Sequence, residues 1–330
     1  MKRLCTIALT SGDPCGIGPE VLLKTLRIVR SLPSLRLLVI GDHEVFARLA
    51  RRLRQPMPTW DVVSSIEALT ERPTRLVFLD CGHRSRFQIG GSNRHAGQAS
   101  LAYLDQAIAG WRRGAIDAVV TGPITKWAVA LGAPGFIGQT EYLASAMGRR
   151  EVVMMFVSDR LRVALVTRHL PLGEVPRRVT SRTLEATIQL TVEALQKSFR
   201  IRHPRVAVCG INPHAGEHGR CGREERRVME PVLERLRRRG ISCDGPLAAD
   251  GLFADASRYD VVVCAYHDQG LIPFKMTARD AGCQLSVGLP IIRTSPDHGS
   301  GLDIAGRGIA QPGSMIYALQ LAMKLASAKR

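Results

Sequence analysis

The sequence predicts an α/β protein with a largely parallel sheet, and two observations support this fold class. Short apolar runs rich in β-branched residues alternate with amphipathic stretches along the whole chain, an order typical of parallel strands covered by helices. The chain has 330 residues, of which 45% are hydrophobic and 23% charged, an ordinary globular composition. A chain of this length has room for two domains, each with its own hydrophobic core.

The individual elements follow from these patterns. An apolar run ends at Thr10, before a turn and a helix that starts at Pro19. Further apolar runs predict strands at 35–41, 74–80, 116–122, 152–158, 161–167, 205–211 and 259–265. Amphipathic patterns predict helices over 95–114, 181–199 and 223–240. In such sheets chemistry gathers at the carboxyl ends of the strands, so the polar residues that follow the strands are the candidates for function.

The first turn, SGDPCGIG at residues 11–18, has two glycines that suggest a phosphate-binding loop. A dinucleotide-binding G-x-G-x-x-G motif needs a third glycine, but Val21 stands there. Glu20 lies in the first turn of the helix that follows, where its carboxylate would repel a phosphate. We therefore predict a tight turn between a strand and a helix.

The charge is strongly positive, because 46 basic and 29 acidic residues give a net charge of +17. A basic nucleic-acid-binding protein is therefore the non-enzyme alternative. The basic clusters lack interleaved aromatic residues that would stack on bases, and no nucleic-acid-binding module is recognisable. A positive electrostatic field would also attract anionic substrates, so the charge does not require nucleic acid as a partner.

The cysteines and the apolar runs indicate the compartment. None of the eight cysteines forms a CxxC pair, and several lie in apolar runs, which predicts buried reduced thiols in a cytoplasmic protein. The apolar stretch at the start is short and lacks a cleavage site, so we expect no signal peptide. No apolar run reaches the roughly twenty residues of a membrane span, so we expect no membrane partner.

Three predicted strands lead into a histidine, at His169, His214 and His267. Neutral imidazole is a common ligand of divalent metals, and three imidazoles leave coordination positions open for a substrate. Asp268 follows His267 directly, and Asp250 lies in the loop GPLAAD. Either carboxylate would serve as a proton acceptor or as a hydrogen-bond partner of a metal ligand. A single histidine at such a position is more often a satisfied polar residue, so the prediction depends on all three together.

A second group of residues has the chemistry of a phosphate site. Lys275 closes the stretch HDQGLIPFK, Arg293 follows an apolar run, and Thr140 lies in GQTEYLA. An ammonium, a guanidinium and a hydroxyl together would hold a phosphate monoester, with the guanidinium in a bidentate arrangement. Each residue alone is equally typical of a surface charge or a helix cap.

Ten stretches of the chain together resemble the 4-hydroxythreonine-4-phosphate dehydrogenases of vitamin B6 (pyridoxine) biosynthesis. They run in order from residue 11 to about 308: SGDPCGIGPE, TGPITK, GQTEYLA, TRHLPL, GINPHAGE, GREE, GPLAAD, YHDQGLIPFK, GLPIIRTSPDHG and LDIAGRG. The resemblance implies an oxidoreductase that uses NAD (or NADP) and a divalent metal to oxidise and decarboxylate 4-phosphooxy-L-threonine to 3-amino-2-oxopropyl phosphate. It also implies a homodimer with its active site at the subunit interface.

The resemblance assigns roles to particular residues. It implies a divalent metal (zinc, cobalt, magnesium or similar) on His169, His214 and His267, with Asp250 and Asp268 as the candidates for the catalytic base. The implied substrate-binding residues are Gln139, Thr140, Lys275, Gln284 and Arg293. Gln139 and Gln284 stand where the family usually has histidine and asparagine. The alternatives within the family are therefore dehydrogenases of a 4-phosphorylated sugar acid, such as threonate or erythronate phosphate, and a relative that acts on a dihydrodiol.

A wider resemblance links the first turn and HGSGLDIAGRGIAQP to the β-decarboxylating dehydrogenases of isopropylmalate and isocitrate. It implies two α/β domains with a cleft between them, and a dinucleotide site that is not a Rossmann fold. The implied cofactor-side domain is 1–125 plus 285–330, and 126–284 is the implied domain for metal, substrate and dimerisation. The residues implied to lie along the adenosine are His298, Gly299, Ser300 and Asp303. A carboxylate at Asp303 would repel a 2′-phosphate, which favours NAD over NADP.

Overall fold

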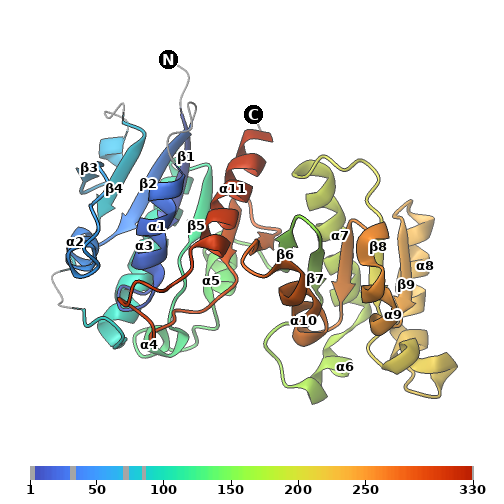
Figure 1. Ribbon diagram of the computed structural model, residues 1–330. Helices are drawn as coiled ribbons and strands as arrows, with labels where there is room; N and C mark the ends of the chain where they lie inside the picture. The colour runs from blue at the N-terminus through green and yellow to red at the C-terminus, as the bar shows by residue number, and fades with distance from the viewer. Residues whose placement is uncertain (1–3, 30–34, 70–73, 84–86, 329–330) are drawn as a thin grey trace. The chain divides into compact units, whose positions relative to one another are not determined.

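The computed structural model describes residues 4–29, 35–69, 74–83 and 87–328 (Figure 1). The chain divides into two compact units, 1–149 with 289–330, and 150–288. Sequence analysis placed 126–149 in the second domain and 285–288 in the first, whereas here 126–149 belong to the first unit and 285–288 to the second. In residues 126–149, helix α4 (Lys126–Ala130) packs so closely on α3 (Arg94–Arg112) that a Cβ on Gly97 would lie 2.2 Å from the Ala128 carbonyl oxygen.

The first unit is built on a parallel sheet with the strand order β3-β4-β2-β1-β5-β12. These strands are β1 (Cys5–Thr10), β2 (Leu35–Gly41), β3 (Asp61–Val63), β4 (Leu76–Asp80), β5 (Ala118–Thr121) and β12 (Ile292–Pro296). All the residues of β1 and β5 are buried, as expected of strands with helices on both faces.

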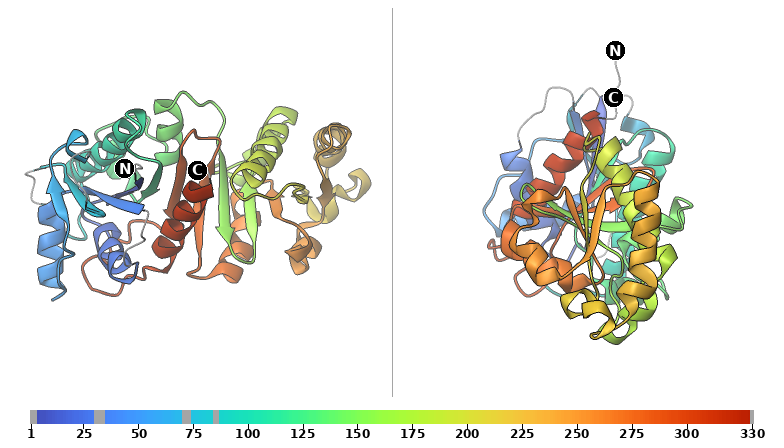
Figure 2. Two further views of the ribbon diagram at one scale, coloured as in Figure 1. Left: turned by 90° about the horizontal axis from the view of Figure 1, so that it is seen from above. Right: turned by 90° about the vertical axis from the view of Figure 1, so that its right-hand side faces the viewer.

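Helices cover both faces of this sheet. Helix α3 lies on one face, and α1 (Gly18–Ile28) and α11 (Gly313–Ala328) lie on the other, as the two views of Figure 2 show. The remaining helices of the unit are α2 (His43–Arg52), α4, α5 (Gln139–Ala146) and a 3₁₀ turn at Glu67–Leu69. Asn93 caps α3 by accepting a hydrogen bond from the Ala96 amide at 3.0 Å, which fixes where this central helix begins.

The second unit contains a mixed sheet with the strand order β11-β6-β7-β10-β8-β9. Its strands are β6 (Val153–Ser158), β7 (Arg162–Leu165), β8 (Val206–Cys209), β9 (Cys243–Leu247), β10 (Val261–Cys264) and β11 (Gly282–Val287). Strands β7, β10, β8 and β9 run parallel, while β6 is antiparallel to both of its neighbours. Only residues 159–161 connect β6 to β7, too few for the crossover that a parallel pair needs.

Helices also cover both faces of the second sheet. Helices α7 (Ser181–Lys197) and α8 (Glu230–Arg238) lie on one face, and α9 (Ala249–Ala254) and α10 (His267–Ala278) lie on the other (Figures 1 and 2). Buried apolar residues of β6, β7, β8 and β10 pack against Leu271 and Phe274 of α10. Shorter turns lie at Leu172–Glu174, Val175–Arg178 (α6), Pro213–Gly219, Glu225–Met229 and Ala256–Arg258.

The α/β class predicted from the alternation is confirmed, and every predicted strand and helix is present. The predicted helix 223–240 differs in detail, because Glu225–Met229 is a π-helical turn that leads into α8. The short strands β3, β9, β11 and β12 were not predicted. None of the eight cysteines, all within the described ranges, forms a disulfide, and six of them are buried. Among the described residues, no helix is long and apolar enough to cross a membrane.

Candidate functional site

The first turn of the chain packs against backbone, which leaves no room there for a phosphate. A Cβ on Gly16 would lie 2.6 Å from the Ser300 carbonyl oxygen, and one on Gly18 would lie 2.0 Å from the Ser11 carbonyl oxygen. The Ile17 amide donates to the same Ser300 oxygen at 2.8 Å. The glycines therefore serve close backbone packing, in agreement with the predicted tight turn.

Two side chains of α1 hold the segment that precedes α11. The Glu20 carboxylate is fully buried and accepts from the amide of Ala310 at 3.0 Å and from Lys24 Nζ at 2.9 Å. Lys24 Nζ also donates to the carbonyl oxygens of Gly308 and Ala310, at 2.8 and 2.6 Å. This buried ion pair ties the C-terminal glycine-rich segment to the helix that follows the first turn.

The residues predicted to bind the cofactor, His298, Gly299, Ser300 and Asp303, follow β12 in the loop before α11. Ser300 has a structural role, because its carbonyl accepts from Ile17 and its hydroxyl accepts from Thr125 Oγ1 at 2.9 Å. Asp303 is exposed. The buried His298 Nε2 has no hydrogen-bond partner within the described residues, so a ligand donor or acceptor would satisfy it.

Arg293 and Thr140, predicted to hold a phosphate, are adjacent in the first unit. Arg293 on β12 is only 3% exposed, and its Nη1 donates to Thr140 Oγ1 at 3.3 Å. Its Nε and Nη2 donate to Thr121 Oγ1 at 3.0 and 2.6 Å. Thr121 is the last residue of β5, the neighbour of β12, so the guanidinium lies at the carboxyl end of β5. Thr121 was not predicted as a functional residue.

Gln139 begins α5, one residue before Thr140. Its Nε2 donates to the Gly122 carbonyl at 3.0 Å, which identifies the nitrogen and fixes the amide orientation. The buried Oε1 atom has no hydrogen-bond partner within the described residues. An amide oxygen is an acceptor only, so this atom suits a ligand group that donates a hydrogen.

The second unit carries the other two residues predicted to bind substrate. Lys275 is exposed on α10, one of the last residues of that helix. Gln284 is 4% exposed on β11, and its Nε2 donates to Ser286 Oγ at 3.0 Å. A buried amide with a side-chain partner of this kind has a fixed orientation.

Two of the three predicted metal ligands are side by side. The rings of His169 and His267 have centroids 5.7 Å apart. His169 follows β7, and His267 is the first residue of α10 after β10, the strand paired with β7. His214 follows β8, on the other side of β10. Among the described residues, no three histidine, cysteine, aspartate or glutamate side chains of one chain are grouped to hold a metal ion.

The two predicted base candidates differ in their surroundings. Asp268 is exposed, and its Oδ1 lies 2.7 Å from His267 Nδ1. A carboxylate at this nitrogen fixes the tautomer that leaves Nε2 as a ligand atom. Asp250 is exposed in the first turn of α9, with no contact of this kind to a histidine in the described structure.

Hydrogen bonds tie together the strand ends that carry the three histidines. Thr167 Oγ1 donates to the Ala265 carbonyl at 2.7 Å, which joins the ends of β7 and β10. Gln269 Oε1 accepts from the Ala265 amide at 2.7 Å, and its Nε2 donates to the Gly210 carbonyl at 2.7 Å, which joins β10 to β8. Sequence analysis missed both residues. Both lie two residues from a predicted ligand and inside the family stretches TRHLPL and YHDQGLIPFK, but neither side chain has a chemistry that singles it out.

The segment that carries His214 has an unusual backbone. His214, Ala215, Gly216, Glu217 and His218 all have positive φ, between 41° and 81°. Left-handed geometry costs about 1–2 kcal/mol for each residue other than glycine, so the surroundings must hold this turn in place. Such strain gathers at functional sites, which agrees with the prediction that His214 has a functional role.

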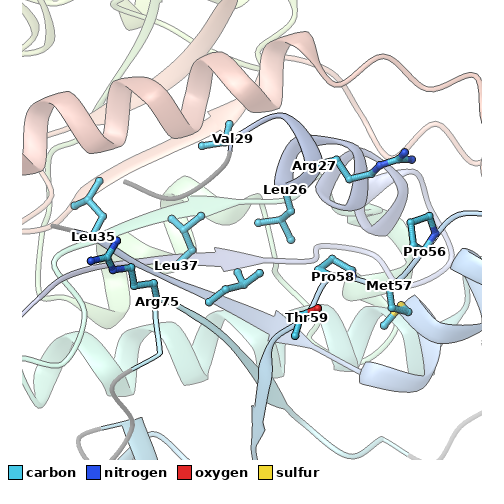
Figure 3. Close-up of a pocket in the computed structure, with 11 residues that line it drawn as sticks. Leu26, Arg27, Val29, Leu35, Leu37, Pro56, Met57, Pro58, Thr59 and Arg75 are labelled. Carbon is cyan, nitrogen blue, oxygen red and sulfur yellow. The ribbon is translucent and has the colours of Figure 1, made fainter. Parts of the chain in front are cut away.

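One cavity lies apart from these residues. It has a volume of about 590 Å³ and is lined by the end of α1, the first residues of β2 and β4, and residues 56–59 (Figure 3). The lining is mostly apolar, with Arg27 and Arg75 among it. It lies at the amino ends of β2 and β4, whereas the three predicted metal ligands follow the carboxyl ends of β7, β8 and β10. None of the predicted site residues lines it.

Comparisons with known proteins extend these observations. The family model described as pyridoxal phosphate biosynthetic protein PdxA matches residues 34–322. The chain belongs to this family. A 4-hydroxythreonine-4-phosphate dehydrogenase from Desulforapulum autotrophicum is 41% identical over 320 residues, which cover 96% of this chain and 94% of that protein.

Solved structures of this family have the same fold. A 4-hydroxythreonine-4-phosphate dehydrogenase from Burkholderia phymatum is 38% identical, superposes with a TM-score of 0.80 and covers 98% of both chains. A terephthalate 1,2-cis-dihydrodiol dehydrogenase from Burkholderia xenovorans is 32% identical with a TM-score of 0.65, again over 98% of both chains. The resemblance found in the sequence motifs is confirmed, as is the predicted fold class.

Proposed function

We propose that this protein is a 4-hydroxythreonine-4-phosphate dehydrogenase in pyridoxal phosphate biosynthesis. It oxidises the secondary alcohol of 4-phosphooxy-L-threonine, passing a hydride to a nicotinamide cofactor and a proton to a base. The β-keto acid then loses carbon dioxide and takes up a proton to give 3-amino-2-oxopropyl phosphate. The near full-length identity of 41% to a dehydrogenase of that name carries the proposal.

The phosphate of the substrate is held by Arg293 and Thr140. The guanidinium is already oriented by two bonds to Thr121 Oγ1, at 3.0 and 2.6 Å, so little side-chain freedom is lost when an anion binds. Its burial strengthens a charge-assisted hydrogen bond to phosphate oxygens. A phosphate fixed there orients the reacting carbon, which lowers the entropic part of the barrier. Lys275 and Gln284 are proposed as further substrate contacts.

A divalent metal is held by His169, His267 and His214. The chemistry of the donor set fits a metal such as zinc or cobalt, because neutral imidazole is a preferred ligand of both. The metal, when bound, supplies a Lewis acid that stabilises negative charge on the reacting oxygen. The contact of 2.7 Å between His267 Nδ1 and Asp268 favours the tautomer in which Nε2 of that ring carries no proton and would serve as the ligand atom.

Asp250 is the catalytic base. Of the two candidates, Asp268 is engaged with His267, so its removal changes the histidine tautomer as well as any proton transfer. Asp250 has no such contact in the described structure and is exposed in the first turn of α9. Asp250→Asn should lower kcat and leave metal affinity unchanged, whereas Asp268→Asn should lower both. Equal metal affinity in the two variants, with kcat lost only in Asp268→Asn, would reverse the assignment.

NAD is the preferred cofactor. The exposed Asp303 carboxylate follows His298, Gly299 and Ser300 in the loop that Glu20 and Lys24 hold. A carboxylate near the adenosine ribose accepts from its hydroxyl and repels a 2′-phosphate. Asp303→Asn should therefore raise kcat/KM for NADP relative to NAD. A ratio that does not change would remove Asp303 from the cofactor site.

The active enzyme is a homodimer whose subunits share the site. Large apolar side chains are exposed close in sequence to the proposed ligands. Ile272 and Met276 on α10, which begins with His267, are 59% and 77% exposed. Leu170 and Leu172, directly after His169, are 38% and 67% exposed. Exposed apolar side chains of this size, gathered around a functional site, are typical of a subunit interface.

A second candidate substrate is a 4-phosphorylated sugar acid. Gln139 stands where the family usually has histidine, and its Oε1 is an acceptor without a partner in the described structure. An amide oxygen repels a phosphate dianion but accepts from a substrate hydroxyl or ammonium group. Both candidate substrates carry hydroxyls, and only phosphooxythreonine carries an ammonium group.

One substrate panel tests the proposal. Purified protein with NAD and a divalent metal is given 4-phosphooxy-L-threonine, 4-phosphothreonate or a cis-dihydrodiol, and NADH formation is followed. We expect the highest kcat/KM with the amino acid. Turnover of the sugar acid alone would move the enzyme to carbohydrate metabolism, and turnover of the dihydrodiol alone would contradict the phosphate site.

A further inference from the structure

Glu225 is a buried carboxylate inside the turn that carries His214. It is 1% exposed, at the start of the π-helical turn Glu225–Met229. Its Oε1 accepts from the amides of Ile211 and Asn212, both at 2.8 Å. Its Oε2 accepts from Asn212 Nδ2 at 3.0 Å. One side chain therefore satisfies two successive backbone donors and the side-chain amide just before Pro213 and His214.

The glycines of this region make room for that carboxylate. A Cβ on Gly216 would lie 2.6 Å from Glu225 Oε2. A Cβ on Gly210 would lie 2.8 Å from the Ala215 Cα and 3.3 Å from Glu225 Oε1. The carboxylate therefore fills the inside of the turn, where a larger residue at either glycine would displace it.

The left-handed run begins where these hydrogen bonds end. Residues 211 and 212 are held by Glu225, and positive φ starts at His214 and continues to His218. A run of this kind persists only where the surroundings fix it. Within the turn itself, the Ala215 amide donates to the Asn212 carbonyl at 3.1 Å and the Cys221 amide to the Gly216 carbonyl at 3.1 Å. Both bonds depend on the position of residues that Glu225 holds or contacts. π-helical turns, such as the one that Glu225 begins, are also frequent at functional sites.

We propose that Glu225 is a positioning residue for His214. Its carboxylate fixes the backbone of Ile211 and Asn212, and so the direction in which the imidazole of His214 leaves the end of β8. The role rests on the proposed function, in which His214 is a metal ligand. Glu225 is proposed to act on His214 through the residues just before it, Ile211 and Asn212.

The test measures metal affinity in the absence of substrate. Glu225→Gln keeps the size of the side chain and one acceptor oxygen, but it turns an amide donor toward Asn212 Nδ2. We expect the affinity for zinc or cobalt, measured by competition with a chromophoric chelator, to fall about tenfold or more. We also expect faster hydrogen exchange of the Ile211 and Asn212 amides in the metal-free protein, and a lower kcat with little change in KM.

A control variant and a second substitution of Glu225 show whether a change in metal affinity comes from the Glu225 carboxylate. Glu230→Gln changes an exposed glutamate five residues further along and should leave metal affinity and exchange unchanged. Glu225→Ala removes every acceptor; if it fails to fold, Glu225→Gln still carries the test. Faster amide exchange in Glu225→Gln with wild-type metal affinity would reduce Glu225 to a structural residue and overturn the proposal.

The failure of the proposed function would look different. If His214→Ala binds metal as tightly as wild type, His214 is not a ligand and the proposed metal site is wrong. If His214→Ala loses metal affinity while Glu225→Gln keeps it, the site stands and only the positioning role fails.

Discussion

Arg293 is enclosed by protein, with 3% of its surface exposed, yet its guanidinium lies against two threonine hydroxyls, that of Thr121 at the carboxyl end of β5 and that of Thr140 in the first turn of α5. A buried guanidinium in a fixed orientation is suited to bidentate recognition of phosphate, which a lysine ammonium cannot reproduce. This residue therefore gives the most specific prediction about the substrate.

Arg293→Lys should raise KM for the phosphorylated substrate on the order of tenfold. A lysine ammonium lacks the paired donors of the guanidinium, so at least one charge-assisted hydrogen bond to the phosphate is lost. The value of kcat should fall as well, because a phosphate held less firmly orients the reacting carbon less well. Steady-state kinetics measure both constants. Arg36→Lys is the matched control, because Arg36 of the same unit donates to the backbone carbonyl of Leu69 at 2.9 Å and is not a proposed substrate contact. An unchanged KM in Arg293→Lys would exclude Arg293 from the phosphate site.

His83 gives a pH-dependent prediction. Its Nδ1 lies 3.2 Å from Asp42 Oδ1, and the hydrogen bond and charge of Asp42 raise the pKa of His83 above its ordinary value of 6.5. A raised pKa means that protonated His83 stabilises the folded state at low pH, and that this stabilisation is lost as the pH rises through the folded-state pKa.

His83→Asn should therefore lower the free energy of unfolding more at pH 6 than at pH 8. Urea denaturation at both values measures the difference, and an NMR titration of the wild-type imidazole measures the pKa directly. A larger loss at pH 8 would contradict the sign of the shift. The variant should not alter metal affinity, because His83 belongs to the first unit and the proposed metal ligands to the second.

At the scale of elements, three strand ends carry the predicted metal ligands, and they are joined by side-chain hydrogen bonds. Gln269 links β10 to β8 through the Ala265 amide and the Gly210 carbonyl, each at 2.7 Å. The register of a parallel sheet fixes the positions of the strands, but it does not fix the conformation of the loops that follow them. The hydrogen bonds of Gln269 hold the backbone at the start of two of these loops, after β8 and β10.

Gln269→Leu should lower the free energy of unfolding by about 2 kcal/mol, since two backbone hydrogen bonds at a partly buried position are lost. Metal affinity should fall as well, because the ends of β8 and β10 are no longer joined. Thermal denaturation and chelator competition measure these effects. Gln196→Leu is the control, because Gln196 also donates to a backbone carbonyl, but at an exposed site. A loss of stability without a loss of metal affinity would separate Gln269 from the metal site.

The elements that were predicted and those that were missed differ in a physical way. Strands such as 35–41 and 259–265 are long apolar runs, and burial on both faces makes them visible in the sequence. β9 contains Asp244, Gly245 and Pro246, and β12 is mostly polar, so neither has an apolar signature. β12 is nevertheless buried throughout, because it pairs with β5 and α11 packs on it.

The same distinction holds for the site. The histidines, Arg293 and Thr140 were predicted because imidazole, guanidinium and hydroxyl groups have a distinctive chemistry for binding metal or phosphate. Thr121, Gln269 and Glu225 also lie in the family stretches, but they were not singled out, because a threonine at a strand end, or a glutamine or glutamate near a helix, has no distinctive pattern. Their roles come from hydrogen bonds between residues far apart in the chain, such as Arg293 Nη2 to Thr121 Oγ1, 172 positions away.

At the scale of the whole molecule, the proposed active enzyme is a homodimer. In the single chain, Met276 is 77% exposed and Ile272 is 59% exposed. Met276→Glu, alone or with Ile272→Glu, replaces an exposed apolar side chain by a charged one. In the free subunit these changes should leave stability nearly unchanged, because neither side chain is in the core. Across an interface the buried charge would destabilise the dimer.

We therefore expect the Met276→Glu protein to be a folded monomer by light scattering, with turnover lost. Val62→Glu is the control, because Val62 on β3 of the first unit is an exposed apolar residue (46% exposed). This variant should remain dimeric and active. A Met276→Glu protein that stays dimeric and active would exclude this face of α10 from the interface.

The central claim is that this protein oxidises a phosphorylated amino-acid alcohol at a metal site made of histidines. The most direct measurement is NADH formation by the purified protein with 4-phosphooxy-L-threonine and NAD, before a chelator is added, after it, and after zinc or cobalt is restored. We expect turnover that stops with the chelator and returns with the metal. Turnover that the chelator does not affect, or no turnover by a folded, metal-loaded dimer, would contradict the central claim.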